Sequence, residues 1–118
     1  MSHAGTATPV LTIEVEHCPD KVAVVRCHGK LVAGSTDVLS KGVRPLLADC
    51  RRIVLDLSDL QHTDSMGLGA LVRLYVAAKS AGCSLELTHL SQQIRNLLGL
   101  THLLDVFTII GESGVKMM

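Results

Sequence analysis

Apolar and polar residues alternate in several stretches of the chain, and the longer stretches between them follow a helical period. Residues 10–16 and 21–31 alternate as half-buried strands do, and Pro19-Asp20 marks a turn between them. The two runs therefore predict an antiparallel hairpin. The apolar run at 52–57 is typical of a central strand that is covered on both faces. The remaining predicted strands are residues 84–88 and 106–110.

Helices are predicted between the later strands. Residues 29–34 are predicted to form a loop, and a helix follows from about residue 35 to 49. Pro45 is expected to limit or kink that helix because it removes one backbone donor. A second helix is predicted from about residue 65 to 81, and a third starts at Ser91. The order of elements predicts an α/β fold: a single mixed β-sheet of about five strands with an N-terminal antiparallel hairpin, right-handed crossovers and three to four helices.

The length of 118 residues and the hydrophobic content of 47% suit one domain with a single core. We expect residues 1–9 to be a disordered lead-in, residues 10–110 to form the domain and residues 111–118 to be a tail. The N-terminus lacks the basic start and apolar middle of a signal peptide, and no stretch of about eighteen apolar residues occurs. These patterns predict a cytoplasmic protein without membrane insertion.

Composition and charge argue against several partners. Eleven basic and eleven acidic residues balance, and no basic run marks a phosphate-binding surface. With no Trp, one Tyr and one Phe, the chain lacks aromatic platforms for stacking bases, so we expect no nucleic-acid partner. The cysteines form no C-x-x-C pair and predict free, mostly buried thiols in a reducing compartment, with no metal and no cofactor. They are Cys18, Cys27, Cys50 and Cys83.

The most informative motif is Ser58-Asp-Leu-Gln-His-Thr-Asp-Ser-Met-Gly-Leu-Gly69, between the central strand and the second helix. It places Asp64 and Ser65 at a strand-to-helix junction. A hydroxyl at such a junction has two uses. It caps the helix by accepting backbone N–H groups, or it accepts a phosphate on an exposed corner, where the helix N–H groups stabilise the added charge.

A helical wheel divides the second helix into two faces. The predicted core face is Leu68, Leu71, Val72, Tyr75 and Ala78. The opposite face is predicted to bind a protein, because it is unusually apolar for a stripe that faces solvent. It consists of Met66, Ala70, Arg73, Leu74 and Ala77. Gly67 and Gly69 indicate a close approach, either by an internal neighbour or by a partner.

Four segments together resemble the STAS domain of bacterial anti-sigma factor antagonists: Val54-Leu-Asp-Leu57, Asp64-Ser-Met-Gly-Leu-Gly69, Ala81-Gly82 and Leu85-Glu-Leu87. The resemblance covers residues 11–110, and its D-S-x-G-[LI]-G segment is fairly specific for this family. It implies a regulatory binding protein rather than an enzyme. Ser65 would be phosphorylated by a partner anti-sigma factor with serine kinase activity, and a phosphatase would reverse the reaction. Asp64 is implied as the companion of the phosphoacceptor, and it is also a candidate cap of the helix.

The resemblance also implies where the partner binds. Family members commonly carry an acidic pair, a glutamate and an aspartate, after the second strand, and the aspartate helps engage the kinase. This chain has Lys30 and Val32 at those positions. This departure keeps an alternative open: a STAS scaffold subunit of a signalling or lipid-transport complex that is not phosphorylated. The residues predicted or implied to bind the partner are Lys30, Val32, Asp64, Ser65, Met66, Gly67, Ala70, Arg73, Leu74 and Ala77.

Three other functions fit the sequence less well. A hydrolase triad around His62 and Ser65 is disfavoured because adjacent loop residues rarely converge and no G-x-S-x-G elbow occurs. Residues 29–34 match neither dinucleotide-binding nor P-loop patterns. A zinc site would need four ligands from the hairpin, but strand alternation lets only one residue of each neighbouring pair share a face. Those four candidates are His17, Cys18, Cys27 and His28.

Overall fold

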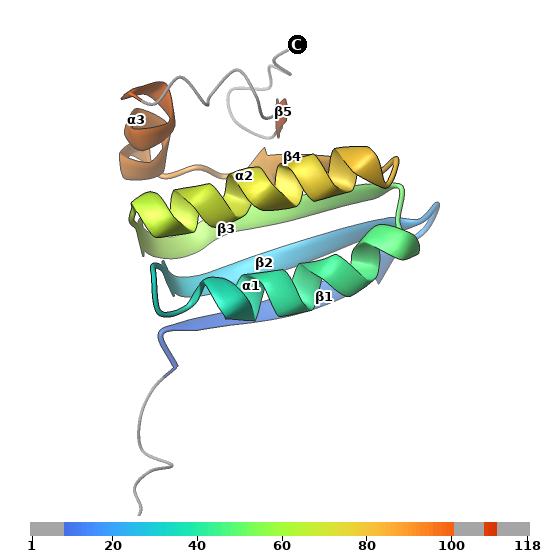
Figure 1. Ribbon diagram of the computed structural model, residues 1–118, viewed down its shortest axis with the longest axis horizontal. Coiled ribbons are helices and arrows are strands. Elements are labelled where there is room, and N and C mark those ends of the chain that lie inside the picture. The colour runs from blue at the N-terminus through green and yellow to red at the C-terminus, as the bar shows by residue number, and fades with distance from the viewer. Residues whose placement is uncertain (1–8, 101–107, 111–118) are drawn as a thin grey trace, which may run out of the picture.

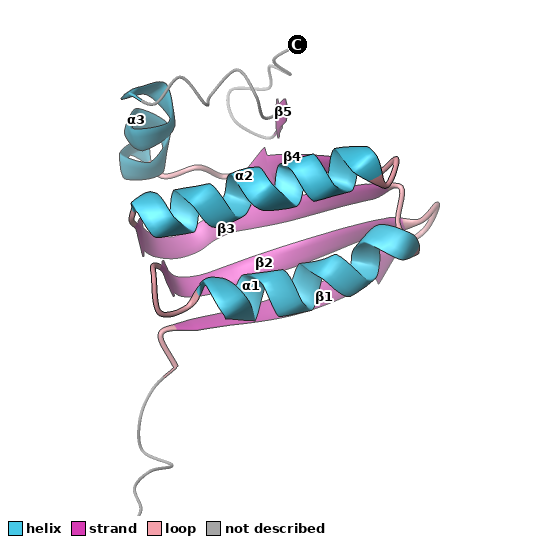
Figure 2. Ribbon diagram, in the orientation of Figure 1, coloured by secondary structure: helices cyan, strands magenta, loops and turns pink. Residues whose placement is uncertain are grey.

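The computed structural model of the chain describes residues 9–100 and 108–110. It contains a five-stranded sheet in the order β1-β2-β3-β4-β5 (Figures 1 and 2). β1 (Leu11–Cys18) pairs antiparallel with β2 (Val22–Leu31), and β2 pairs parallel with β3 (Arg52–Thr63). β4 (Ser84–Thr88) and β5 (Thr108–Ile110) continue the parallel part. The predicted mixed sheet with an N-terminal hairpin is confirmed.

Helices connect the parallel strands. α1 (Thr36–Val43) passes directly into a 3-10 helix, η2 (Arg44–Ala48), which has Pro45 in its first turn. The predicted limit at Pro45 is confirmed, because proline cannot donate the next α-helical hydrogen bond. α2 (Ser65–Ser80) and α3 (Gln92–Leu100) follow β3 and β4. Within the described ranges no helix is long and apolar enough to cross a membrane. The predicted lead-in, apart from Pro9, and the predicted tail lie outside these ranges.

α1 and α2 lie side by side on one face of the sheet, with α1 over the hairpin and α2 over β3 and β4 (Figure 1). Because side chains alternate along a strand, every second residue of the inner strands reaches this helical layer. The core is aliphatic, and it holds α2 firmly against the sheet. Its largest fully buried members are Leu31, Leu39, Ile53, Leu55, Leu57, Leu71, Leu74, Leu87, Ile94 and Leu98.

β3 is longer than the sequence pattern predicts. It has 12 residues and continues past Leu57 to Thr63. β2 ends at Leu31, as its alternating pattern predicts, so the predicted loop at residues 29–34 begins only after that residue. Parallel pairing explains the extension, since the two strands remain in register contact up to Leu31 and Thr63 after two register shifts. In the second half of β3 only Leu60 and Thr63 are buried. The other residues in this half are exposed and mostly polar, so a prediction based on apolar runs does not recognise it as a strand.

The opposite face of the sheet carries charged side chains in pairs. Arg26 contacts Glu16 across the hairpin, with Nη1 2.7 Å from Oε1. Arg52 Nη2 lies 2.8 Å from Oε1 of Glu86, whose side chain is almost fully buried. A buried carboxylate needs such a partner, because an unpaired charge away from water is costly. The pairs connect β1 to β2 and β3 to β4.

His28 lies between two carboxylates on this polar face. Its Nδ1 is 2.7 Å from Asp59 Oδ2 on β3, and its Nε2 is 3.1 Å from Glu14 Oε1 on β1. Ionised carboxylates only accept hydrogen bonds, so both contacts are satisfied only when both ring nitrogens carry a proton. The hydrogen bond to Asp59, followed by that to Glu14, raises the pKa of His28. The imidazolium ion thereby links three strands.

We predict that alkaline pH weakens this link. The folded-state pKa of His28 lies above its unfolded value of about 6.5, so its stabilising effect is complete below that pH and is lost as the pH rises through the folded pKa. Urea unfolding over this window should show a falling free energy of unfolding, and His28→Asn should flatten that dependence. His17→Asn changes an exposed histidine on β1 and should keep the wild-type dependence. Identical pH profiles for both variants would contradict the prediction.

Candidate functional site

The junction between β3 and α2 is held at the end of β2. Thr63, the last residue of β3, donates its hydroxyl to the Leu31 carbonyl oxygen at 2.7 Å, and this hydrogen bond is buried. The Asp64 N–H donates to the same oxygen at 3.4 Å. The start of α2 therefore takes its position from the pairing of β2 with β3.

Asp64 caps α2. Its backbone is extended, and its Oδ1 accepts the Gly67 N–H at 2.8 Å. Its Oδ2 accepts the Ala33 N–H at 3.2 Å, which ties the loop between β2 and α1 to the same carboxylate. The Gly67 N–H contributes most to lowering the pKa of Asp64, because hydrogen bonds to the charged form favour it. The capping role predicted for Asp64 is confirmed.

Ser65 is the first residue of α2, and it is exposed. Because Asp64 supplies the cap, the Ser65 hydroxyl is free of that task, and no residue in the described part of the chain hydrogen-bonds to it. Two uses were predicted for a hydroxyl at this junction, helix capping and phosphate acceptance. Asp64 rather than Ser65 caps the helix. The Ser65 oxygen remains accessible to another protein.

Gly67 and Gly69 differ in what surrounds them. A Cβ at Gly67 would collide with the Leu31 carbonyl oxygen and with the Thr63 hydroxyl oxygen. The close approach at Gly67 is therefore internal, and it lets α2 sit directly against the ends of β2 and β3. A Cβ at Gly69 would lie 3.4 Å from Nη1 of Arg73, on the exposed side of the helix.

This difference predicts opposite effects of the same substitution. Gly67→Ala should lower the free energy of unfolding by about 1–3 kcal/mol, the usual cost of overpacking, because backbone atoms have to move. Gly69→Ala should leave it unchanged or raise it by up to about 1 kcal/mol through higher helix propensity. Urea unfolding of both variants measures the difference, and equal stabilities would contradict the internal contact at Gly67.

The predicted outer face of α2 is partly wrong. Ala70 and Leu74 are only 1% exposed and Gly67 is also buried, so these residues belong to the core side, and Ala77 is half-buried. The wheel divided the helix into two equal halves. In the fold α2 packs against β4 and also against α1, so its buried stripe is wider than one half. Of the predicted core residues, those that are buried are Leu68, Leu71 and Ala78.

The exposed side of α2 is a narrower stripe, which we call the α2 outer face. Met66 and Val76 are 53% and 56% exposed, and Arg73 is exposed between them. Gly69 completes the stripe and is half-buried. Val72, which the sequence pattern assigned to the core, is half-buried and packs against the core, so that assignment is confirmed. The pattern missed Val76, which steps of three and four residues from the serine would have indicated, since residues at that spacing share a helix face.

The loop between β2 and α1 lies next to Ser65. Ala33 joins it to the α2 cap, and Val32 is half-buried, with its N–H donated to the Ser35 hydroxyl at 2.9 Å. Lys30 is exposed and forms no ion pair with the residues that the structure describes. Lys30 and Val32 are therefore at the same end of the sheet as the serine, and neither position carries a carboxylate.

A hydrolase triad does not form at Ser65. His62 Nδ1 lies 3.1 Å from Gln93 Nε2 of α3. The Asp64 carboxylate is occupied by the helix cap, and the Asp59 carboxylate is 2.7 Å from the His28 ring on the polar face. The candidate base and acids are therefore engaged with other residues, and none of them hydrogen-bonds to the Ser65 hydroxyl.

The four zinc candidates of the hairpin do not converge. His17 is paired with Ala23, and Cys27 is paired with Ile13, so the candidates occupy different levels of the hairpin. Among the described residues no group of three His, Cys, Asp or Glu side chains is placed to hold a metal ion. All four cysteines are free, and three are buried. Burial raises the pKa of the Cys27 thiol to about 12, which keeps it protonated.

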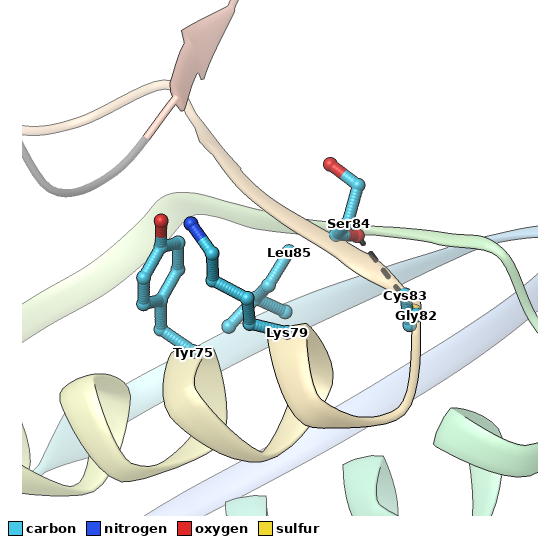
Figure 3. A pocket seen from close by; sticks show the side chains of 6 residues that line it. All are labelled: Tyr75, Lys79, Gly82, Cys83, Ser84 and Leu85. Carbon is cyan, nitrogen blue, oxygen red and sulfur yellow. Dashed lines mark hydrogen bonds between the residues drawn. The ribbon is translucent and has the colours of Figure 1, made fainter.

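A cavity of about 340 Å³ lies at the other end of α2. Figure 3 shows Tyr75 and Lys79 projecting from the helix beside the start of β4. Lys79 Nζ is 5.7 Å from the centroid of the Tyr75 ring, within the range of a cation–π contact. Because Ser65 follows the end of β3 and this cavity borders the beginning of β4, the two places are separate. The other lining residues are Gly82, Cys83, Ser84 and Leu85.

Comparison with known proteins identifies the family. The STAS domain model matches residues 12–114. The chain is 32% identical over 89 residues to the anti-sigma-B factor antagonist of Bacillus subtilis (strain 168), across 75% of this chain and 82% of the relative. The anti-sigma factor antagonist SpoIIAA in its unphosphorylated form gives a TM-score of 0.72 at 15% identity, over 86% of this chain and 90% of that one. The phosphorylated form of SpoIIAA, from Bacillus, gives 0.68 at 15% identity, over 86% and 94%.

The chain therefore belongs to the STAS domain family of anti-sigma factor antagonists. This confirms the resemblance that was seen in the segment from Asp64 to Gly69 and in its neighbours. The two SpoIIAA structures share too little sequence with this chain to add more than the fold.

Proposed function

We propose that the protein is a cytoplasmic anti-sigma factor antagonist that binds a kinase-type anti-sigma factor in a partner-switching pathway. Phosphorylation of Ser65 by that kinase ends the binding, and a phosphatase restores it. The observation that carries the proposal is the exposed Ser65 hydroxyl, which has no hydrogen-bond partner among the described residues and stands beside an Asp64 that already caps the helix. Sequence relatives named as anti-sigma factor antagonists support it.

A phosphoryl group on Ser65 is compatible with the fold. The side chain is exposed, so its modification displaces no packed neighbour. The N-terminus of a helix favours added negative charge, because its first N–H groups and the helix dipole are directed toward it. Phosphorylation therefore changes the surface of the protein without disturbing its packing.

The α2 outer face, which begins beside Ser65, is the surface we assign to the partner. It exposes Met66 and Val76, with a single cation at Arg73. Methionine and arginine are both enriched in protein interfaces relative to the rest of the surface. A phosphate of about −1.5 to −2 charge at the rim of this surface opposes docking, through desolvation and through repulsion of nearby acidic groups. The binding surface and the switch are thereby adjacent.

The scaffold alternative rests on one observation, the absence of carboxylates at Lys30 and Val32. It predicts that no kinase modifies the protein. Incubation with the kinase-type anti-sigma factor of the same organism and ATP, followed by intact-mass measurement, separates the two functions. Addition of one phosphoryl group that is lost in Ser65→Ala supports the antagonist.

We predict that the charge at residue 65 controls affinity for that anti-sigma factor. Ser65→Asp should weaken binding by at least about 10-fold, because a carboxylate adds charge at the rim of the interface. Ser65→Ala should stay within about 3-fold of the wild type, since it removes only an exposed hydroxyl. Calorimetric titration with the purified anti-sigma factor measures both affinities.

Ser80→Asp provides the matched control. Ser80 is exposed and is the last residue of α2, so the variant adds the same charge to the same helix at the opposite end. It should bind like the wild type. Equal affinities for Ser65→Asp and Ser65→Ala, or equal losses for Ser65→Asp and Ser80→Asp, would contradict the proposed switch.

A further inference from the structure

Arg73 lies back over the position of Gly69. A Cβ built on Gly69 would be 3.4 Å from the Arg73 Nη1, so the guanidinium lies directly beside the position that a side chain at residue 69 would take. Side chains on an α-helix lean toward its N-terminus, which directs Arg73 along the helix toward Ser65. The absence of a side chain at Gly69 leaves that path open.

Ser65, Gly69 and Arg73 follow one another at intervals of four residues. Residues at this spacing share a face of the helix, and four residues correspond to a rise of roughly 6 Å. The guanidinium therefore lies about one helical turn from the serine. A phosphoryl group extends the Ser65 side chain, and an exposed arginine has several rotatable bonds with which to close the remaining gap.

Arg73 is also uncommitted. Among the described residues it forms no ion pair, although other cations of the protein do, such as Arg26 with Glu16. The second cation of α2, Lys79, lies near the far end of the helix and contacts the Tyr75 ring. An exposed arginine without a carboxylate partner is the side chain best suited to bind phosphate oxygens with two parallel N–H groups.

We propose that Arg73 binds the phosphoryl group of phosphorylated Ser65 within the same chain, by reaching across Gly69. This inference rests on the proposed function for the existence of the modification, and it adds how the modification is read. In the unphosphorylated protein Arg73 belongs to the α2 outer face and is available to a partner. In the phosphorylated protein it is paired with the phosphate, so the same event adds negative charge at the rim and withdraws the only cation of that face.

The test uses the full chain with phosphoserine placed at residue 65 by genetic encoding, so that it needs no kinase. Phosphorus NMR titration measures the second pKa of the phosphate, which is about 6 for phosphoserine. A guanidinium that pairs with the dianion lowers this value. Arg73→Gln should raise the second pKa of the phosphate by about 0.5 unit, which is about a 3-fold decrease in its acid dissociation constant. Gly69→Leu, which fills the path between the two groups, should raise it similarly.

Lys79→Gln is the matched control, because it removes one positive charge from the same helix without touching the path over Gly69. It should leave the phosphate pKa at the wild-type value. The helix N-terminus acts equally in all variants, so differences between them report the arginine. Unchanged values in Arg73→Gln, or equal shifts in Arg73→Gln and Lys79→Gln, would overturn the inference. Failure of the kinase to modify Ser65 would instead contradict the proposed function and leave this titration unaffected.

Discussion

One backbone oxygen, the carbonyl of Leu31 at the end of β2, organises the functional end of this protein. It accepts the Thr63 hydroxyl and the Asp64 N–H, and Gly67 packs against it with no room for a side chain. A buried carbonyl requires hydrogen-bond partners, so the chain leaving β3 is drawn to this point before it turns into α2. The location of Ser65 follows from that constraint, because it is the next residue after the cap.

Two neighbouring residues at the start of α2 have different roles: Asp64 caps the helix, and Ser65 is the proposed phosphoacceptor. Asp64 accepts N–H groups from α2 and from the loop after β2, which consumes its carboxylate in a structural role. Ser65 is released from that role and faces outward. A chemical change at Ser65 therefore alters the surface, while the interactions that hold α2 in place remain. Such a separation is what a switch on a stable scaffold requires, because charge is added where no packing depends on it.

Features that depend on a short stretch of sequence were predictable. Features that depend on contact with another strand or helix were not. The hairpin, the order of strands and helices, the effect of Pro45 and the cap at Asp64 are determined within a few residues of the chain. The second half of β3 was missed because its strand character comes from pairing with β2 rather than from apolar residues. Ala70 and Leu74 were assigned to the wrong side of α2, because the width of the buried stripe is set by α1, which packs beside it.

The sequence by itself determined the family, the fold class and the serine at a strand-to-helix junction, since these follow from periodicity and from a short contiguous motif. Only the tertiary structure decided which of the two glycines is enclosed, which residues of α2 face outward and which side chains surround Ser65. The physical reason is that burial is a property of neighbours. In the sequence Gly67 and Gly69 look equivalent, because both are glycines two residues apart. In the fold their neighbours differ, since Gly67 packs against Leu31 and Gly69 lies beside Arg73.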